Sequence, residues 1–238
     1  MSRAGDALPA TRAGVLDDGN RMADDGDVLR RLRTETATEH RAVEDALDLL
    51  DPELTRARLV TALTRMHGFW CAAEAGLDAW AAAEPADATR VGWSRRRRSH
   101  LFAADLAELD APATPVDQPH LPPVAGTDTA LGRLYVLEGS SLGGVFIDRH
   151  LATLPHVAAP GALRAFSPYG AETGAMWHAF RSATRERVAG GGDAERVVAS
   201  ARETFGALAV WCGAVAAEQG DSGSALPRAH VRGSEVTA

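Results

Sequence analysis

The sequence predicts an all-α protein built as one helical bundle. Apolar residues recur at steps of three and four between residues 27 and 218, which is the spacing of amphipathic helices. No segment shows the sustained two-residue alternation of a β-strand, and clusters of proline and glycine separate the periodic segments. At 238 residues, the chain is long enough to bury one full core. We therefore expect a single helical domain over residues 27–218.

The predicted helices begin and end at recognisable signals. Asp27 can cap the first helix, and Asp51-Pro52 supplies a cap and a first-turn proline for the second. Prolines from Pro112 to Pro123 predict a long loop, and Gly190-Gly191-Gly192 separates the last two helices. The expected helices cover residues 27–50, 52–80, 93–109, 128–154, 172–189 and 193–218.

The two ends of the chain differ from the middle. Residues 1–26 and 219–238 are polar and aperiodic, so we expect disordered tails. No apolar run approaches the roughly 18 residues that cross a bilayer, and the start of the chain is acidic where a signal peptide is basic and then apolar. Cys71 and Cys212 are isolated cysteines without CxxC spacing. These features predict a cytoplasmic protein that is not bound to a membrane.

The charges exclude some functions. The net charge of −7 argues against a general nucleic-acid binder, whose surface would be basic. All 25 cationic side chains are arginine, because the chain contains no lysine. A Schiff-base lysine and a P-loop lysine are therefore excluded, and any bound carboxylate meets guanidinium groups.

Three glycines interrupt the helix predicted over residues 128–154. Gly139, Gly143 and Gly144 lie within six residues, and an interior glycine costs a helix about 1 kcal/mol relative to alanine. They indicate either a kink or close helix crossing, or a bare face against which a flat, bulky group can lie.

His40 falls on the apolar face of the first predicted helix, between Thr36 and Val43, so we expect its imidazole to point into the core. It is either a hydrogen-bonded structural residue or a nitrogen ligand. An imidazole that faces a bare glycine surface would suit a planar iron macrocycle.

Two stretches resemble the haem oxygenase family. Residues 32–44, with His40, resemble the proximal helix of these enzymes, and residues 134–144 resemble their distal helix. The sequence Glu-Gly-Ser-Ser-Leu-Gly-Gly over residues 138–144, with residues 166–170 and 177–181, is most similar to the bacterial enzymes that supply biliverdin to phytochromes. The resemblance covers about residues 28–217 and implies the haem-oxygenase-like helical bundle as the fold.

The resemblance also implies an activity. The chain would open haem oxidatively to biliverdin, carbon monoxide and ferrous iron, with haem as both cofactor and substrate. His40 would be the iron ligand, and Gly139, Gly143 and Gly144 would let the distal backbone lie against the haem and bend bound dioxygen toward one ring edge. Since no flavin or nicotinamide site is recognisable, a ferredoxin or a reductase would supply electrons, and a bacteriophytochrome could accept the product.

Further residues enter by the same resemblance. Arg33, Arg181 and Arg185 would bind the haem propionates, although each could equally be a solvated surface charge. Tyr135 and Phe205 would line the pocket or simply pack in the core. Ser140 stands where many members have an aspartate that orders proton-donating waters, so the hydroxyls of Ser140 and Ser141, or waters on backbone carbonyls, would have to serve.

Two other functions stay open at this stage. The missing aspartate is compatible with a haem carrier or sensor that has lost turnover. A thiaminase-like enzyme of the same architecture would use Cys71 or Cys212 as a nucleophile. The run Arg95–Arg98 is interpreted as a solvated helix face, with docking of an acidic electron donor as the alternative.

Overall fold

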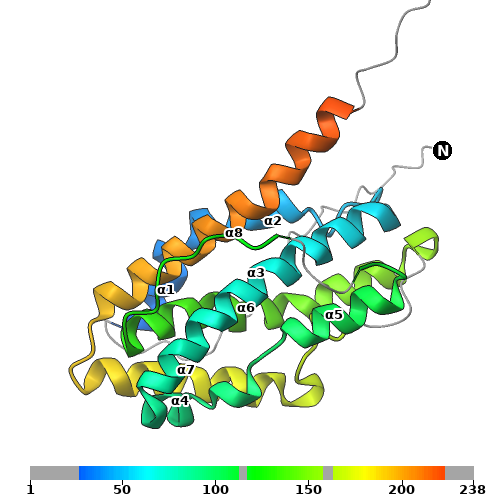
Figure 1. Ribbon diagram of the computed structural model, residues 1–238. Coiled ribbons are helices and arrows are strands. Elements are labelled where there is room, and N and C mark those ends of the chain that lie inside the picture. Colours follow the sequence, from blue (N-terminus) through cyan, green and yellow to red (C-terminus); the bar gives the residue numbers. More distant parts are fainter. Residues whose placement is uncertain (1–26, 113–116, 158–162, 223–238) are drawn as a thin grey trace, which may run out of the picture.

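The computed structural model describes residues 27–112, 117–157 and 163–222, with side chains as far as residue 213. Within these ranges the chain is helical and contains no strand, so the all-α prediction is confirmed (Figure 1). The elements are α1 (Val28–Glu35), α2 (Ala37–Leu47), α3 (Arg56–Ala83), α4 (Pro85–Val91), η1 (Trp93–Arg95), α5 (Ser99–Glu108), α6 (Thr127–Ala152), η2 (Pro155–Val157), η3 (Gly170–Glu172), α7 (Thr173–Ala189) and α8 (Ala194–Ser222). The predicted tails lie outside the described residues, except that α8 continues past its expected end at residue 218.

The first predicted helix is divided into α1 and α2. Asp27 caps α1 as expected, since its carboxylate accepts a hydrogen bond from the backbone N–H of Leu29 at 3.1 Å. The break falls at Thr36, whose buried hydroxyl donates to the carbonyl of Leu32 at 2.6 Å. Asp48 then ends α2 with a left-handed φ of 43°. Periodicity alone could not show the break, because the apolar spacing continues through it.

The start of α3 differs from the prediction. Thr55, not Asp51, is the N-cap, and its hydroxyl accepts from the N–H of Arg58 at 3.2 Å. The Asp51 carboxylate instead accepts from the N–H of Glu53 at 2.8 Å and forms a tight turn. The Asp-Pro pair therefore marks a turn that precedes the helix.

The helix predicted over residues 93–109 is wrong in its first half. The chain forms the short helix α4, turns at Gly92 with a φ of 72°, and passes through η1 before α5 begins at Ser99. The Glu74 carboxylate caps α5, because it accepts hydrogen bonds from the N–H groups of Arg98 and Ser99 at 2.6 and 2.8 Å. A negative charge at the N-terminus of a helix stabilises the helix, because the peptide dipoles place partial positive charge there.

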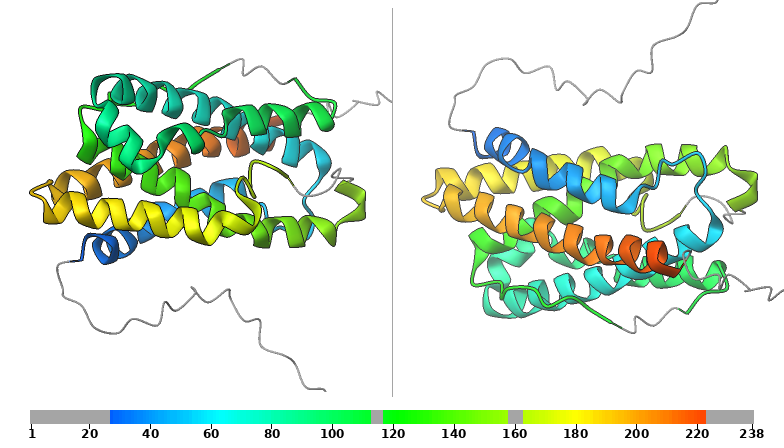
Figure 2. Two further views of the ribbon diagram at one scale, coloured as in Figure 1. Left: turned by 90° about the horizontal axis from the view of Figure 1, so that it is seen from below. Right: turned by 90° about the horizontal axis from the view of Figure 1, so that it is seen from above.

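Helix α8 packs against two helices that carry residues of interest, α2 and α6. Helices α2 and α6 each pack along α8 and touch each other little. Figure 2 shows α8 (orange) running beside α2 (blue). Gly132 permits the close crossing of α6 and α8, because a Cβ there would overlap the carbonyl oxygen of Val197. A glycine that the sequence analysis did not consider thus sets the distance between these two helices.

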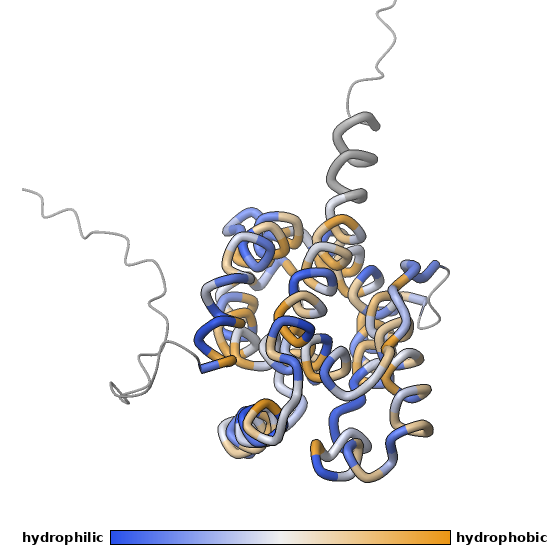
Figure 3. Tube along the Cα trace, turned by 90° about the vertical axis from the view of Figure 1, so that its left-hand side faces the viewer, coloured by the Kyte–Doolittle hydropathy of each residue, from blue (hydrophilic) through white to orange (hydrophobic). Residues whose placement is uncertain are grey.

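The long helices enclose one hydrophobic core. Trp70 and Trp80 of α3, Phe102 of α5 and Phe180 of α7 are almost completely buried in it. Figure 3 shows apolar and polar stretches alternating around the helical turns. In the part of the chain that the structure describes, no helix has the length and apolar character needed to cross a membrane.

Candidate functional site

The glycines of α6 fall into two groups. A Cβ added at Gly139 or Gly143 would meet no described atom within 4 Å apart from the surrounding backbone of its own helix, so these two residues leave one face of the helix bare. Gly144 is buried, and a Cβ there would overlap the carbonyl group of Phe166. Since Gly139 and Gly143 are one turn apart, they share a face, whereas Gly144 is turned away by about 100°. We call the surface at Gly139 and Gly143 the open face.

Gly144 therefore corrects the expectation that all three glycines line one site. Its role is the close packing of α6 on the segment that holds Phe166. That segment is fixed from a second side by Asp105, whose carboxylate accepts hydrogen bonds from the N–H groups of Arg164 and Ala165 at 3.0 and 2.9 Å. Burial raises the pKa of this carboxyl group.

Aromatic side chains connect His40 to the open face. The imidazole of His40 on α2 lies edge-on to the ring of Phe205 on α8, with the ring centres 5.4 Å apart. Phe205 in turn lies 6.4 Å from the ring of Tyr135, which is on α6 one turn before Gly139. The ring centre of Trp177 on α7 lies 5.9 Å from that of Tyr135. We call Phe205, Tyr135 and Trp177 the aromatic row. The structure thus brings together residues that the sequence analysis assigned to one site from three separate helices.

The imidazole of His40 does not point into the core. The side chain is 52% exposed and pairs with the carboxylate of Glu44 at 3.5 Å. The reason is that α2 buries only Val43, so that His40 stands at the edge of the apolar contact and not inside it. The sequence prediction of a core histidine is wrong, and the imidazole is accessible beside the aromatic row.

The predicted arginines differ in their partners. Arg185 pairs with the Asp27 carboxylate at 2.7 Å, and this hydrogen bond lowers the pKa of Asp27. The charge of Arg181 acts on the same carboxylate. Arg33 is exposed and forms neither a hydrogen bond nor an ion pair with any described residue. Its charge acts on Tyr135, whose pKa is raised chiefly by burial. Of the three, Arg33 is the arginine with capacity left for a carboxylate near the aromatic row.

The run Arg95–Arg98 is not a solvated helix face. Arg95 and Arg97 are exposed and pair with Glu172 and Asp78 at 2.7 and 2.5 Å. Arg96 and Arg98, in contrast, are 2% and 1% exposed. The run lies on η1 and the turn that follows it, where alternate side chains point to opposite sides. The interpretation as a docking surface is therefore wrong for half of the run.

The two buried arginines enclose a carboxylate on α6. The Glu138 side chain is 1% exposed and is bound by the guanidinium of Arg96 and by the hydroxyl of Tyr169, the latter at 2.7 Å. Arg98 lies 3.8 Å from the same carboxylate and donates to the hydroxyl of Ser140 at 3.1 Å. Burial raises the pKa of Tyr169 well above its usual value. These residues form a buried polar network directly beside the first glycine of the open face.

Comparison with known proteins identifies the family. No family model matches the chain. A curated relative from Xanthomonas campestris pv. campestris (strain 8004), named heme oxygenase, is 31% identical over 116 residues, which are 48% of this chain and 66% of that relative. The chain belongs to the haem oxygenase family. The match spans just under two thirds of the relative's length.

The fold agrees with that of a solved member of the haem oxygenase family. The NO- and CO-bound haem oxygenase from Neisseria meningitidis matches with a TM-score of 0.64 and 23% identity. The alignment covers 78% of this chain and 90% of that structure. The predicted haem-oxygenase-like bundle is thereby confirmed as the fold.

The buried network of this haem oxygenase-family chain was missed at the level of sequence. The available signal was Glu138 itself, since it stands alone in an apolar stretch that runs from Leu134 to Gly139. A buried carboxylate requires a cationic or hydrogen-bonding partner. The run Arg95–Arg98 could have been considered as the source of that partner.

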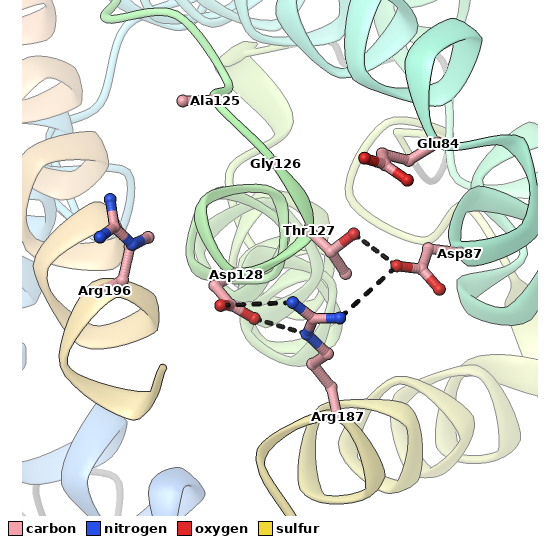
Figure 4. A pocket seen from close by; sticks show the side chains of 8 residues that line it. All are labelled: Glu84, Asp87, Ala125, Gly126, Thr127, Asp128, Arg187 and Arg196. Carbon is pink, nitrogen blue, oxygen red and sulfur yellow. Dashed lines mark hydrogen bonds and ion pairs between the residues drawn. The ribbon is translucent and has the colours of Figure 1, made fainter. Parts of the chain in front are cut away.

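A polar pocket lies at the start of α6. In Figure 4, Arg187 reaches from α7 toward Asp128 and Asp87, with nitrogen–oxygen distances of 2.7 and 3.9 Å. The Thr127 hydroxyl donates to Asp87 at 2.6 Å. Because these charges satisfy one another, the pocket is explained as an ion-pair cluster that joins α4, α6 and α7. The lining residues are Glu84, Asp87, Ala125, Gly126, Thr127, Asp128, Arg187 and Arg196.

The cysteines do not suit nucleophilic catalysis. Cys212 is buried on α8, and burial raises the pKa of its thiol to about 12. Burial also raises the pKa of the Cys71 thiol. Since the thiolate is the reactive form, both groups are poor nucleophiles at neutral pH. This observation removes support from the thiaminase-like alternative.

Proposed function

We propose that this protein is a haem oxygenase that opens haem to biliverdin, carbon monoxide and ferrous iron. The observation that carries the proposal is the open face of α6 at Gly139 and Gly143, joined through Tyr135 and Phe205 to the accessible imidazole of His40. A bare helix surface and a nitrogen ligand at the two ends of one aromatic row suit a flat iron macrocycle.

The residues present fit haem. His40 offers a nitrogen ligand, the open face has room that a side chain at either glycine would fill, and Arg33 has no other anionic partner among the described residues. When bound, haem supplies the iron that activates dioxygen and is itself the molecule oxidised. Cys71 and Cys212 have no role in this assignment.

Each residue then has a separate task. His40 would hold the iron, and Arg33 would pair with a propionate. Gly139 and Gly143 keep side chains off this surface of α6, so that its backbone would border the space where bound haem activates dioxygen. Tyr135 and Phe205 form apolar walls that keep water away from this space.

The test is absorption spectroscopy of the purified protein with ferric haem, before and after addition of ascorbate or a ferredoxin system in air. We expect a Soret band that decays while a broad biliverdin band grows toward the red. A Soret band that is unchanged from that of free ferric haem would contradict the assignment of His40 and the proposed function together.

A haem carrier or sensor is the second candidate. It is favoured by one observation, that Ser140 replaces the expected aspartate and its hydroxyl is already bound to Arg98 and to the Leu137 carbonyl. A Soret band that persists under reducing conditions in air, with no bilin formed, would select this function.

The electron donor and the product acceptor follow from the proposed reaction. The chain would receive electrons from a ferredoxin or a reductase, and a bacteriophytochrome would accept biliverdin. A cytoplasmic location is likewise a prediction. Turnover that proceeds with a ferredoxin system but not with ferric haem and dioxygen alone would support the need for an external donor.

Arg33 gives a prediction on haem affinity. Replacing Arg33 by alanine is expected to weaken haem binding by about fivefold, since one exposed ion pair to a propionate is lost. Haem titration followed at the Soret band measures the change. Arg90→Ala is the matched control, because Arg90 is an exposed arginine that pairs with Asp87 on α4. Equal affinity of the two variants would contradict the role of Arg33.

A further inference from the structure

Ser140 is placed at the border of the open face. It follows Gly139 directly and lies three residues before Gly143, and residues three apart on a helix are surface neighbours. Its hydroxyl accepts a hydrogen bond from Nη1 of Arg98 at 3.1 Å and donates to the Leu137 carbonyl at 2.7 Å. Ser141 has a different environment, since its buried hydroxyl donates to the Glu138 carbonyl at 2.7 Å. Only one of the two serines thus combines a place beside the open face with a cationic partner.

The Leu137 carbonyl has more donors than it can accept. The Ser140 hydroxyl donates to it, Nη2 of Arg98 donates to it as well, and helix geometry directs the N–H of Ser141 at the same oxygen. A carbonyl oxygen has two lone pairs. Of the three donors, the hydroxyl is the one that turns freely about a single bond, so its hydrogen is the one most easily given to another acceptor.

Arg98 is held firmly in this position. Its side chain is 1% exposed and its guanidinium lies 5.7 Å from the centre of the Trp70 ring. Its backbone N–H donates to Glu74, which fixes the start of α5. Its Nε is buried and has no hydrogen-bond partner among the described residues. The guanidinium therefore cannot move to solvent, and its contact with Ser140 is part of the packed interior.

The local charge favours a polarised hydroxyl. Arg96 and Arg98 both lie beside the carboxylate of Glu138 on α6, and the guanidinium of Arg98 also contacts the Ser140 oxygen. A donor that binds the hydroxyl oxygen makes the hydroxyl a stronger donor in turn, and the effect is larger in a buried setting.

We propose that the Ser140 hydroxyl donates a hydrogen bond toward a ligand on the open face, and that Arg98 is the positioning residue that orients it. Arg98 binds the Leu137 carbonyl and the Ser140 oxygen at once, so it competes with the hydroxyl for that carbonyl and leaves the hydroxyl hydrogen able to turn toward a ligand. The proposal rests on the proposed function, and it assigns to Ser140 and Arg98 the polar contact that the missing aspartate would otherwise make.

The test uses the full-length protein loaded with ferrous haem and carbon monoxide. The infrared C–O stretching band responds to a hydrogen-bond donor near the ligand, and loss of the donor moves it to higher frequency. We expect this shift in Ser140→Ala, a band near the wild-type position in Ser140→Thr, and no shift in the neighbouring control Ser141→Ala. Biliverdin formation by Ser140→Ala should fall by about 10²-fold.

Arg98→Lys tests the positioning role. An ammonium group cannot donate in the planar, two-pronged geometry of a guanidinium, so Arg98→Lys should reproduce the shift of Ser140→Ala. The double variant should show no further shift, because both changes remove one contact. Circular dichroism and thermal unfolding of the haem-free variants verify folding.

Several outcomes would overturn the proposal. A wild-type band in Ser140→Ala would remove Ser140 as the donor, and a wild-type band in Arg98→Lys would remove the positioning role. If Arg98→Lys does not fold, guanidinium proton signals of ¹⁵N-arginine-labelled protein decide, since an Arg98 signal that is identical in wild type and Ser140→Ala excludes the contact. A wild-type protein that binds no haem would overturn the proposed function as well, whereas turnover with an unmoved band overturns this inference alone.

Discussion

Replacement of His40 by alanine is expected to abolish the spectrum of histidine-ligated haem and all biliverdin formation, while the protein stays folded. The side chain is 52% exposed, and its described contacts are the Glu44 carboxylate and the ring of Phe205. Substitution of such a side chain changes the free energy of unfolding by about 0.5 kcal/mol or less. Soret absorption and thermal unfolding of the same sample measure the two effects.

The control for this variant is His178→Ala, because His178 is an exposed histidine on α7 outside the aromatic row. It should retain both the spectrum and the activity. Added imidazole should restore a nitrogen-ligated spectrum to His40→Ala by entering the space that the side chain leaves. If His40→Ala keeps the wild-type Soret band without imidazole, another residue is the iron ligand.

Replacement of Gly143 by leucine is expected to lower biliverdin formation by at least about 10²-fold, with a smaller loss of haem affinity. The added side chain enters the space beside bare backbone, where the proposed reaction needs room for dioxygen. Since no atom from another part of the described chain lies within 4 Å of the new Cβ, stability should not fall. Loss of an interior glycine should raise the free energy of unfolding by up to about 1 kcal/mol. Gly139→Leu should behave in the same way.

Gly144→Ala is the matched contrast. The added methyl group would overlap the Phe166 carbonyl, so we expect a loss of about 1–3 kcal/mol in the free energy of unfolding. Urea denaturation of the haem-free variants measures their free energies of unfolding. Initial rates of biliverdin formation with a ferredoxin system measure their activities. If Gly143→Leu and Gly144→Ala were equally destabilised, the distinction between open and packed glycines would be refuted.

The parts of the fold that were predictable are those in which one face stays buried over many turns. Helices α3, α6, α7 and α8 were expected from apolar spacing, and their bounds agree to within a few residues except at the start of α3. The break at Thr36 was not predictable, because the hydroxyl that satisfies the Leu32 carbonyl leaves the apolar pattern unchanged. The late start of α5 at Ser99 was missed because a run of arginines is compatible with a helix surface.

The members of the candidate site were easier to predict than their surroundings. Tyr135, Phe205 and His40 meet as the resemblance implied, yet the exposure of His40 depends on how far α2 lies from α6, which no local pattern records. Gly144 could not be distinguished from Gly143 by residue type, since only the position of Phe166 separates them. The burial of Arg98 likewise depends on a partner from a distant helix.

The two open glycines also decide which positions a stabilised variant of this protein can use. Engineering guided by helix propensity and steric fit alone would choose Gly139 and Gly143 early, because α6 gains stability there without a clash. The resulting proteins would be more thermostable and, on the proposed function, inactive. Gly174, in the first turn of α7, lies outside the candidate site, and a Cβ added there would likewise meet no described atom of another element within 4 Å. A stabilising library can therefore vary position 174 while positions 139 and 143 are kept as glycine.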